Sequence, residues 1–218
     1  MKSFKYWTRQ DLFKKFGLEQ LYDCSLLDEW IGEMNETLGE EEISFLNKNR
    51  QRLVKYIDIW NEQELSINFI GPIITEIDFY TKHTKFFYGR RLVGKINGEE
   101  IGGYIDGMIS EGKYAPEKPY FCLHEYKYEE GSSNDGTGQL VIAMYLAKQI
   151  NRNNLPLYGA YVSGRSWYFV TLTDEGYCKS EVYTATKELD LQQIYLILKR
   201  LKNISVELAM KHQALQAT

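Results

Sequence analysis

The sequence lacks the long apolar run that a membrane helix or a secretion signal would need. None of its 218 residues belongs to a stretch of about eighteen consecutive apolar positions, and the N-terminal segment has no apolar core. We therefore expect neither a membrane partner nor a secretion signal. Linkers rich in glycine, proline or serine, internal repeats and low-complexity tracts are also missing from the sequence. A chain of this length without such breaks predicts one domain.

Cysteine is scarce, and its spacing suggests no pairs. Cys24, Cys122 and Cys178 are odd in number and far apart, without the spacing of metal ligands. This pattern predicts reduced thiols in a cytoplasmic protein and no zinc site. The motif Gly-x-x-x-x-Gly-Lys-Ser/Thr is also missing, which argues against a nucleotide hydrolase with a phosphate-binding loop.

Charge is distributed unevenly along a chain whose net charge is −4. Residues 19–47 hold nine acids and neither lysine nor arginine, so the rest of the chain is net positive. Residues 81–98 show the opposite bias, with no acid and five cations: Lys82, Lys85, Arg90, Arg91 and Lys95. A local field matters more for binding than the total charge, so this mildly acidic chain can still bind a polyanion. The basic stretch is a candidate nucleic-acid contact; the alternative for both stretches is a solvated face.

The apolar pattern divides the chain into a helical N-terminal part and a mixed remainder. Helical spacing and caps predict helices over residues 8–16, around 26–31, over 40–60 and over 62–77, the last kinked at Pro72. Composition predicts strands at 86–88, 91–96, 100–110 and 120–128, with a hairpin turn at Asn97-Gly98. A helix over 139–150, strands at 157–162, 167–172 and 181–184, and a helix over 189–213 follow.

This order of elements predicts an α/β (α+β) fold in which a mixed β-sheet is flanked by helices. We divide the single domain, residues 1–218, into three segments. Residues 1–61 form an N-terminal helical extension, residues 62–172 form the core, and residues 173–218 add a C-terminal strand and helix.

Three charged residues stand in otherwise apolar predicted strands. Asp106 lies in Gly-Tyr-Ile-Asp-Gly-Met-Ile, and Glu125 and Lys127 end Tyr-Phe-Cys-Leu-His-Glu-Tyr-Lys. Strand alternation places Glu125 and Lys127 on one face. Burying unpaired carboxylates is costly, whereas Mg²⁺ prefers oxygen ligands and keeps waters that a substrate phosphate can replace. The sequence therefore predicts a divalent-metal site at these three residues.

An Asp followed about twenty residues later by Glu-x-Lys resembles the motif of the PD-(D/E)XK nuclease superfamily. Two further positions fit that pattern: Glu76 on the helix before the first strand, and Gln139 at the opening of the helix after the motif. The order helix, three strands, helix and strand over residues 62–172 is similar to that superfamily's restriction-endonuclease-like core. Asp106 departs from the name of the motif in following Ile105 rather than proline.

The resemblance implies a Mg²⁺-dependent nuclease that hydrolyses phosphodiester bonds, with DNA as the expected substrate. Asp106, Glu125 and the backbone carbonyl of Tyr126 would hold Mg²⁺ or Mn²⁺. Lys127 would orient or help deprotonate the attacking water and offset negative charge in the transition state.

The helix residues of the pattern have ordinary explanations as well. Glu76 would act through a metal-bound water, but it could be a solvated helix acid. Gln139 would hold a water or a phosphate at a helix N-terminus, but it could simply be a helix-start residue. Glu125 and Lys127 alone could form a surface ion pair of little value.

Two classes of function therefore stay open. The first is the nuclease, which the full ligand set favours. The second is a catalytically inactive nuclease-fold module that binds nucleic acid or a protein partner, and the net acidic charge counts mildly against strong stand-alone DNA binding. A homodimer is open in either case.

Overall fold

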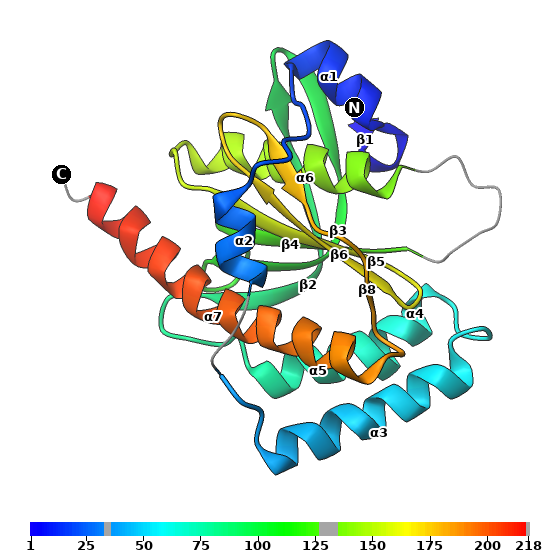
Figure 1. The fold of residues 1–218 in the computed structure, drawn as a ribbon. Helices are drawn as coiled ribbons and strands as arrows, with labels where there is room; N and C mark the ends of the chain where they lie inside the picture. Colours follow the sequence, from blue (N-terminus) through cyan, green and yellow to red (C-terminus); the bar gives the residue numbers. More distant parts are fainter. Residues whose placement is uncertain (33–35, 127–134, 217–218) are drawn as a thin grey trace.

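The computed structural model describes residues 1–32, 36–126 and 135–216, and only the backbone of residues 123–126 and 216. It is a mixed α/β structure in which a curled, eight-stranded mixed sheet is flanked by helices (Figure 1). This confirms the predicted mixed sheet between helices.

The N-terminal helices begin and end where their caps predict. In α1 (Arg9–Phe16), the Thr8 hydroxyl accepts from the Asp11 N–H and the Asp11 carboxylate accepts from the Thr8 N–H, both at 3.1 Å. α2 covers Ser25–Ile31 and α3 covers Glu40–Tyr56. α3 ends before the predicted residue 60 because Asn61 forms a capping box with Glu64 and starts a new helix there.

The predicted kink near Pro72 is a change of helix type. α4 (Glu62–Leu65) continues into a π-helical segment, η2 (Ser66–Ile70), and then into α5 (Gly71–Ile77). Proline has no N–H to donate to the preceding turn, and a wider turn just before it accommodates that loss.

Three long strands form one side of the sheet. β3 (Glu99–Glu111) pairs antiparallel with both β2 (Lys85–Ile96) and β4 (Lys118–Tyr126), and β4 pairs in parallel with β5 (Leu157–Ser163). The connection from β4 to β5 contains α6 (Gly136–Asn151). Asn97 (φ 50°) and Gly98 (φ 81°) form the predicted hairpin turn.

Further strands continue the sheet on both sides. β6 (Ser166–Leu172) follows β5, and β7 (Tyr177–Lys179) and β8 (Tyr183–Thr184) both pair with β6. β1 (Lys2–Ser3) pairs in parallel with β3 and leads into the 3₁₀ turn η1 (Phe4–Tyr6). β6 and β8 fall at the predicted positions, whereas β1 and β7 are additional. Segments of two or three residues are too short to show a strand period, so β1 and β7 were not predicted.

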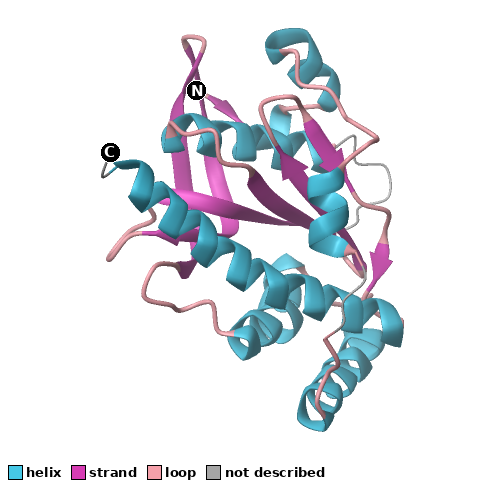
Figure 2. Ribbon diagram, turned by 60° about the vertical axis from the view of Figure 1, so that its left-hand side comes forward, coloured by secondary structure: helices cyan, strands magenta, loops and turns pink. Residues whose placement is uncertain are grey.

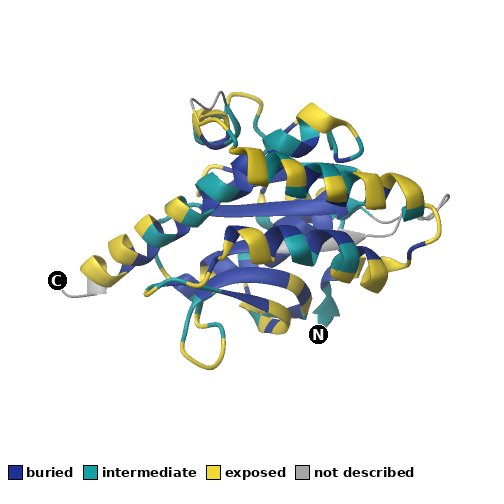
Figure 3. Cartoon of the chain, turned by 90° about the horizontal axis from the view of Figure 1, so that it is seen from below, coloured by how far each residue is buried: buried dark blue, intermediate teal, exposed yellow. Residues whose placement is uncertain are grey.

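Helices cover both faces of the sheet (Figure 2), and much of the sheet between them is buried (Figure 3). A hydrophobic core lies on each face. One core joins α2, α3, α5 and the long C-terminal helix α7 (Glu188–Gln216) to the sheet; the indole of Trp30 meets Tyr158 and Phe169 there with ring centroids 5.0 and 5.3 Å away. The other core surrounds α6 and receives Phe4 and Trp7 from the N-terminal segment. The first residues thus complete the α6 core.

The start of α6 fits closely against the N-terminal segment. A Cβ on Gly138 would lie 2.7–2.8 Å from backbone atoms of Thr8 and Arg9, so only glycine permits this approach. The Asp135 carboxylate caps α6 by accepting from the Gly138 N–H at 3.0 Å, and it also accepts from Arg9.

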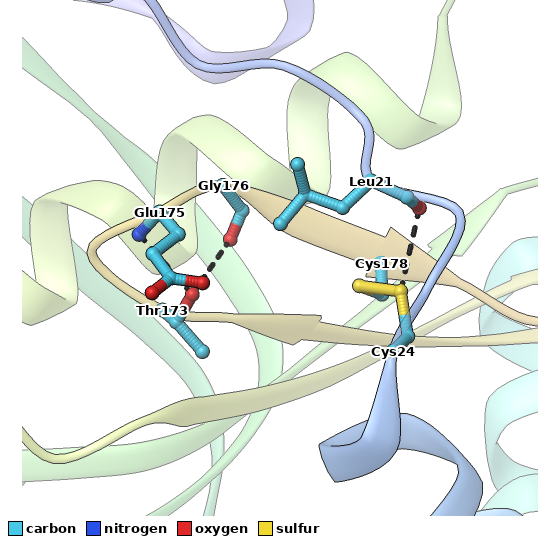
Figure 4. Close-up of a disulfide and its surroundings, with 6 residues drawn as sticks. All are labelled: Leu21, Cys24, Thr173, Glu175, Gly176 and Cys178. Atoms are coloured by element: carbon cyan, nitrogen blue, oxygen red, sulfur yellow. Dashed lines mark hydrogen bonds between the residues drawn. A yellow bond between two sulfur atoms is a disulfide. The ribbon is translucent and has the colours of Figure 1, made fainter.

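The cysteines contradict the expectation of three reduced thiols. Cys24 and Cys178 form a disulfide that joins the chain before α2 to β7, with their Cα atoms 6.1 Å apart (Figure 4). Leu21 donates to the Tyr177 carbonyl at 2.8 Å beside it. The partners are 154 residues apart in sequence, and spacing alone cannot reveal such a pair. Cys122 is buried as a free thiol.

Across the described ranges, no helix is both long and apolar enough to cross a membrane.

Candidate functional site

Asp106 and Glu76 line the same cleft, although thirty positions separate them in the sequence. The cleft measures about 950 Å³ and lies between the middle of the β2–β3 hairpin and the helices α4 and α5. Both acids are exposed. The polar lining also includes Glu62, Thr75 and Tyr88. The cleft therefore presents several carboxylate and hydroxyl groups to one open space.

An irregularity in β2 creates this cleft. Gly89 has a left-handed φ of 56° and lies opposite the position of Asp106 in the register. Phe87 and Leu92 are an odd number of residues apart, yet both pack in the α6 core, so the strand changes pleat at Gly89. The hairpin therefore bends beside Asp106, and the glycine leaves space there.

Tyr88 forms the wall of the cleft next to Gly89. Its side chain is 45% exposed, and its ring centroid lies 4.6 Å from that of Phe86. Partial burial raises the pKa of Tyr88, while a hydrogen bond with Thr75 of α5 opposes that shift. The phenol thus stays protonated near neutral pH and joins the strand wall to the helix wall.

The predicted strand motif follows the end of the β3–β4 ladder. The register pairs at the two ends of this ladder are Glu111 with Lys118 and Gly107 with Leu123. Asp106 lies one residue beyond the Gly107 end on β3, and Glu125 lies two residues beyond the Leu123 end on β4. Glu125 and Tyr126 pair in register with Val162 and Ser163 of β5. The backbone therefore brings both motif strands to the same end of the ladder.

The remaining parts of the motif lie outside what the structure describes. Lys127 is outside the described residues, and of Glu125 only the backbone is described. Convergence of the Asp106 and Glu125 carboxylates thus stays a prediction. The described side chains contain no group of three His, Cys, Asp or Glu residues that could hold a metal, but that set lacks Glu125.

Gln139 lies in the first turn of α6, three residues after the helix begins at Gly136. Its side chain is 96% buried, since only 4% of it is exposed, and its Nε2 has no hydrogen-bond partner among the described residues. The structure does not bring Gln139 into the described lining of the cleft. The Asp135 carboxylate already caps this helix end, which weakens the expectation that the α6 N-terminus holds a phosphate.

The five residues of the basic stretch have different surroundings, and their contact with nucleic acid stays a prediction. Lys85 donates to the Lys113 carbonyl at 3.0 Å, and Lys82 is exposed in the turn before β2. The Arg90 guanidinium lies 5.7 Å from the ring centroid of Phe87, which belongs to the α6 core. Arg91 and Lys95 are exposed on the part of the β2–β3 hairpin beyond Gly89, residues 90–105, which we call the hairpin arm.

The change of pleat places Arg91 rather than Arg90 on the side of the site. Arg91 pairs in register with Tyr104, which is two residues from Asp106 on β3 and, like it, exposed, while Ile105 between them is buried. Arg90 pairs with Ile105. The sequence gives no reason to distinguish the two arginines. Their faces follow from the left-handed conformation of Gly89, which the sequence does not show.

A second cleft, of about 480 Å³, lies beside the first, and Glu62 lines both. Its wall includes the β5–β6 turn, where Arg165 donates to the Asp58 carboxylate at 2.9 Å. Ser163, the register partner of Tyr126, also lines it. The sequence marked this turn only as a turn, and no motif pointed to Arg165 or Glu62.

Comparison with known proteins adds no identification: no family model matches the chain, and no curated protein matches it.

Proposed function

We propose that the chain is a metal-dependent nuclease that hydrolyses phosphodiester bonds, with DNA as its substrate. The observation that supports this most is that Glu76 and Asp106 line one exposed cleft. Asp106 lies just beyond the end of the β3–β4 ladder, and Glu125 lies two residues beyond the same end on β4. Metal-dependent hydrolysis needs carboxylate oxygens and open space for a phosphate in one place.

The order of the elements supports the proposal independently. α5, β2, β3, β4, α6 and β5 follow one another, with β2, β3 and β4 antiparallel and β5 parallel to β4. A restriction-endonuclease-like core would have this order, with its acids on the second and third strands. Asp106 and Glu125 occupy those strands.

The chain's own residues would divide the work as follows. Asp106, Glu125 and the Tyr126 carbonyl would hold Mg²⁺ or Mn²⁺, which when bound polarises the scissile phosphate and lowers the pKa of a coordinated water. Lys127 would orient that water and offset the charge that develops in the transition state. Glu76, across the cleft, would position a further water. We assign Gln139 only a supporting role.

Incubation with DNA and RNA, each in Mg²⁺, Mn²⁺ or EDTA, tests the proposal. We expect cleavage of DNA in either metal, none in EDTA, and loss of cleavage in Asp106→Ala. Glu175→Gln is the matched control, because this exposed acid lies in the β6–β7 turn away from the cleft. Equal cleavage by wild type and Asp106→Ala would contradict the proposal.

A catalytically inactive module that binds nucleic acid or a protein is the second candidate. The exposed cations on the hairpin arm favour nucleic acid over protein. Metal-independent DNA binding without cleavage of any substrate would establish it instead.

A further inference from the structure

The hairpin arm beyond Gly89 carries an exposed aromatic ring beside the cleft. Tyr104 is 68% exposed and lies two residues before Asp106 on β3. Arg91 lies opposite Tyr104 in the register, and its guanidinium lies 3.6 Å from the Met1 sulfur. An exposed tyrosine ring beside an arginine offers a flat apolar face and a positive charge at the same place.

Positive charge continues along the arm. Arg91 and Lys95 are exposed and alternate with the buried Leu92 and Ile96. Within the described parts of the chain, neither cation lies within ion-pair distance of a carboxylate. Glu100 is the register partner of Lys95, so the positive field is strongest near Arg91. At about 3.3 Å per residue, the arm from Gly89 to Lys95 extends roughly 20 Å from the cleft.

This chemistry distinguishes unpaired from paired nucleotides. A base can stack on a tyrosine ring only when its own face is not covered by neighbouring bases. A duplex would offer the arm mainly phosphates, which Arg91 and Lys95 could contact but Tyr104 could not use.

We infer that the face of the β2–β3 arm formed by Tyr104, Arg91 and Lys95 binds an unpaired nucleic-acid strand, with a base stacked on Tyr104 and phosphates at the two cations. The inference rests on the proposed function and names its substrate class: a nucleic acid that is single-stranded next to the bond to be cut. Tyr104 is then a binding residue that positions the strand toward Asp106.

Fluorescence anisotropy in Ca²⁺, which supports binding without cleavage, tests the inference. The probes are a labelled single strand of about 16 nucleotides, as DNA and as RNA, and a blunt-ended duplex of the same DNA strand with its complement. We expect Tyr104→Ala to weaken single-strand binding about tenfold, the scale of one lost stacking contact, and to leave duplex binding unchanged. Tyr104→Trp should retain single-strand binding.

Tyr114→Ala is the matched control. Tyr114 is 82% exposed and has Lys113 at 5.2 Å from its ring centroid, but it lies in the β3–β4 connection. It should not alter binding. Arg91→Gln should reduce the slope of log affinity against log salt by about 0.7, the value for one phosphate contact with a single strand.

The outcomes separate this inference from the proposed function. A selective Tyr104→Ala defect without cleavage by the wild type would retain the inference and overturn the nuclease. Cleavage combined with equal single-strand binding by wild type and Tyr104→Ala would retain the nuclease and reduce Arg91 and Tyr104 to a cross-strand pair. Equal losses for single strand and duplex, or no binding of either probe by the wild type, would overturn the inference.

Discussion

The Arg9 side chain donates to the Asp135 carboxylate at 2.9 Å and joins α1 to the start of α6 across 126 sequence positions. The hydrogen bond with Asp135, helped by its charge, raises the pKa of Arg9. The same carboxylate accepts from two backbone N–H groups, those of Arg9 and Gly138. The side chain of Asp135 should therefore contribute more to the stability of the fold than the side chain of Arg9.

Truncation of the two partners should thus have unequal effects. Asp135→Ala removes the cap of α6 and should lower the free energy of unfolding by about 1–2 kcal/mol. Arg9→Ala should cost at most about 0.5–1 kcal/mol, because its side chain is 54% exposed. Urea denaturation measures both, with Lys15→Ala, which breaks the surface pair with Glu99, as the control. A larger loss in Arg9→Ala than in Asp135→Ala would refute this assignment.

The disulfide should contribute more than any surface contact. Replacing both Cys24 and Cys178 by serine should lower the free energy of unfolding by about 2–5 kcal/mol, because the bridge restricts a long loop of the unfolded chain. Thermal and urea denaturation with and without reductant measure this. A wild type whose stability does not respond to reductant would show that the bridge is not formed. Because disulfides persist mainly in oxidising compartments, a formed bridge weighs against the cytoplasmic prediction.

Cys122 should be chemically silent in the folded protein. It is fully buried, and burial raises the pKa of its thiol to about 12, so the reactive thiolate is scarce at pH 8. A thiol reagent should find no fast-reacting group in the native protein, one in denaturant, and three in denaturant after reduction. Fast reaction of one thiol before unfolding would contradict the burial of Cys122.

Gln139 offers a test in which stability and activity move in opposite directions. The buried Nε2 of Gln139 has no hydrogen-bond partner among the described residues, and such a group costs stability, so Gln139→Met should raise the free energy of unfolding by about 1 kcal/mol. If Gln139 supports cleavage, the same variant should lower the cleavage rate. A destabilised Gln139→Met would mean that Nε2 has a partner, and an unchanged rate would remove Gln139 from the site.

Local signals in the sequence were sufficient for most of the fold. Thr8 and Gly17 bound the first helix, and Asn97-Gly98 forms the hairpin turn, because caps and turns depend on neighbours in sequence. Contacts between distant segments could not be predicted in this way. The Cys24–Cys178 bridge and the parallel pairing of Lys2–Ser3 with β3 exist only after the chain has folded.

The candidate site, too, could be predicted from the sequence only in part. The resemblance to a nuclease motif selected Glu76 and Asp106, and the structure places both in one cleft. Periodicity could not separate Arg90 from Arg91, because the left-handed Gly89 shifts the pleat between Phe87 and Leu92. The exposure of Tyr104 could not be predicted either, since tyrosine in a strand usually packs.

Lys127 tests the central claim most directly, because a fixed ammonium beside metal-bound carboxylates serves hydrolysis more than binding. Single-turnover cleavage of DNA in Mg²⁺ should be slower in Lys127→Ala than in wild type by about two orders of magnitude or more, the usual scale for one preorganised stabilising group. Affinity for the same DNA in Ca²⁺ and the circular dichroism spectrum should change little. Cleavage by Lys127→Ala at the wild-type rate, or no metal-dependent cleavage of any DNA or RNA by the wild type, would contradict catalysis at this site.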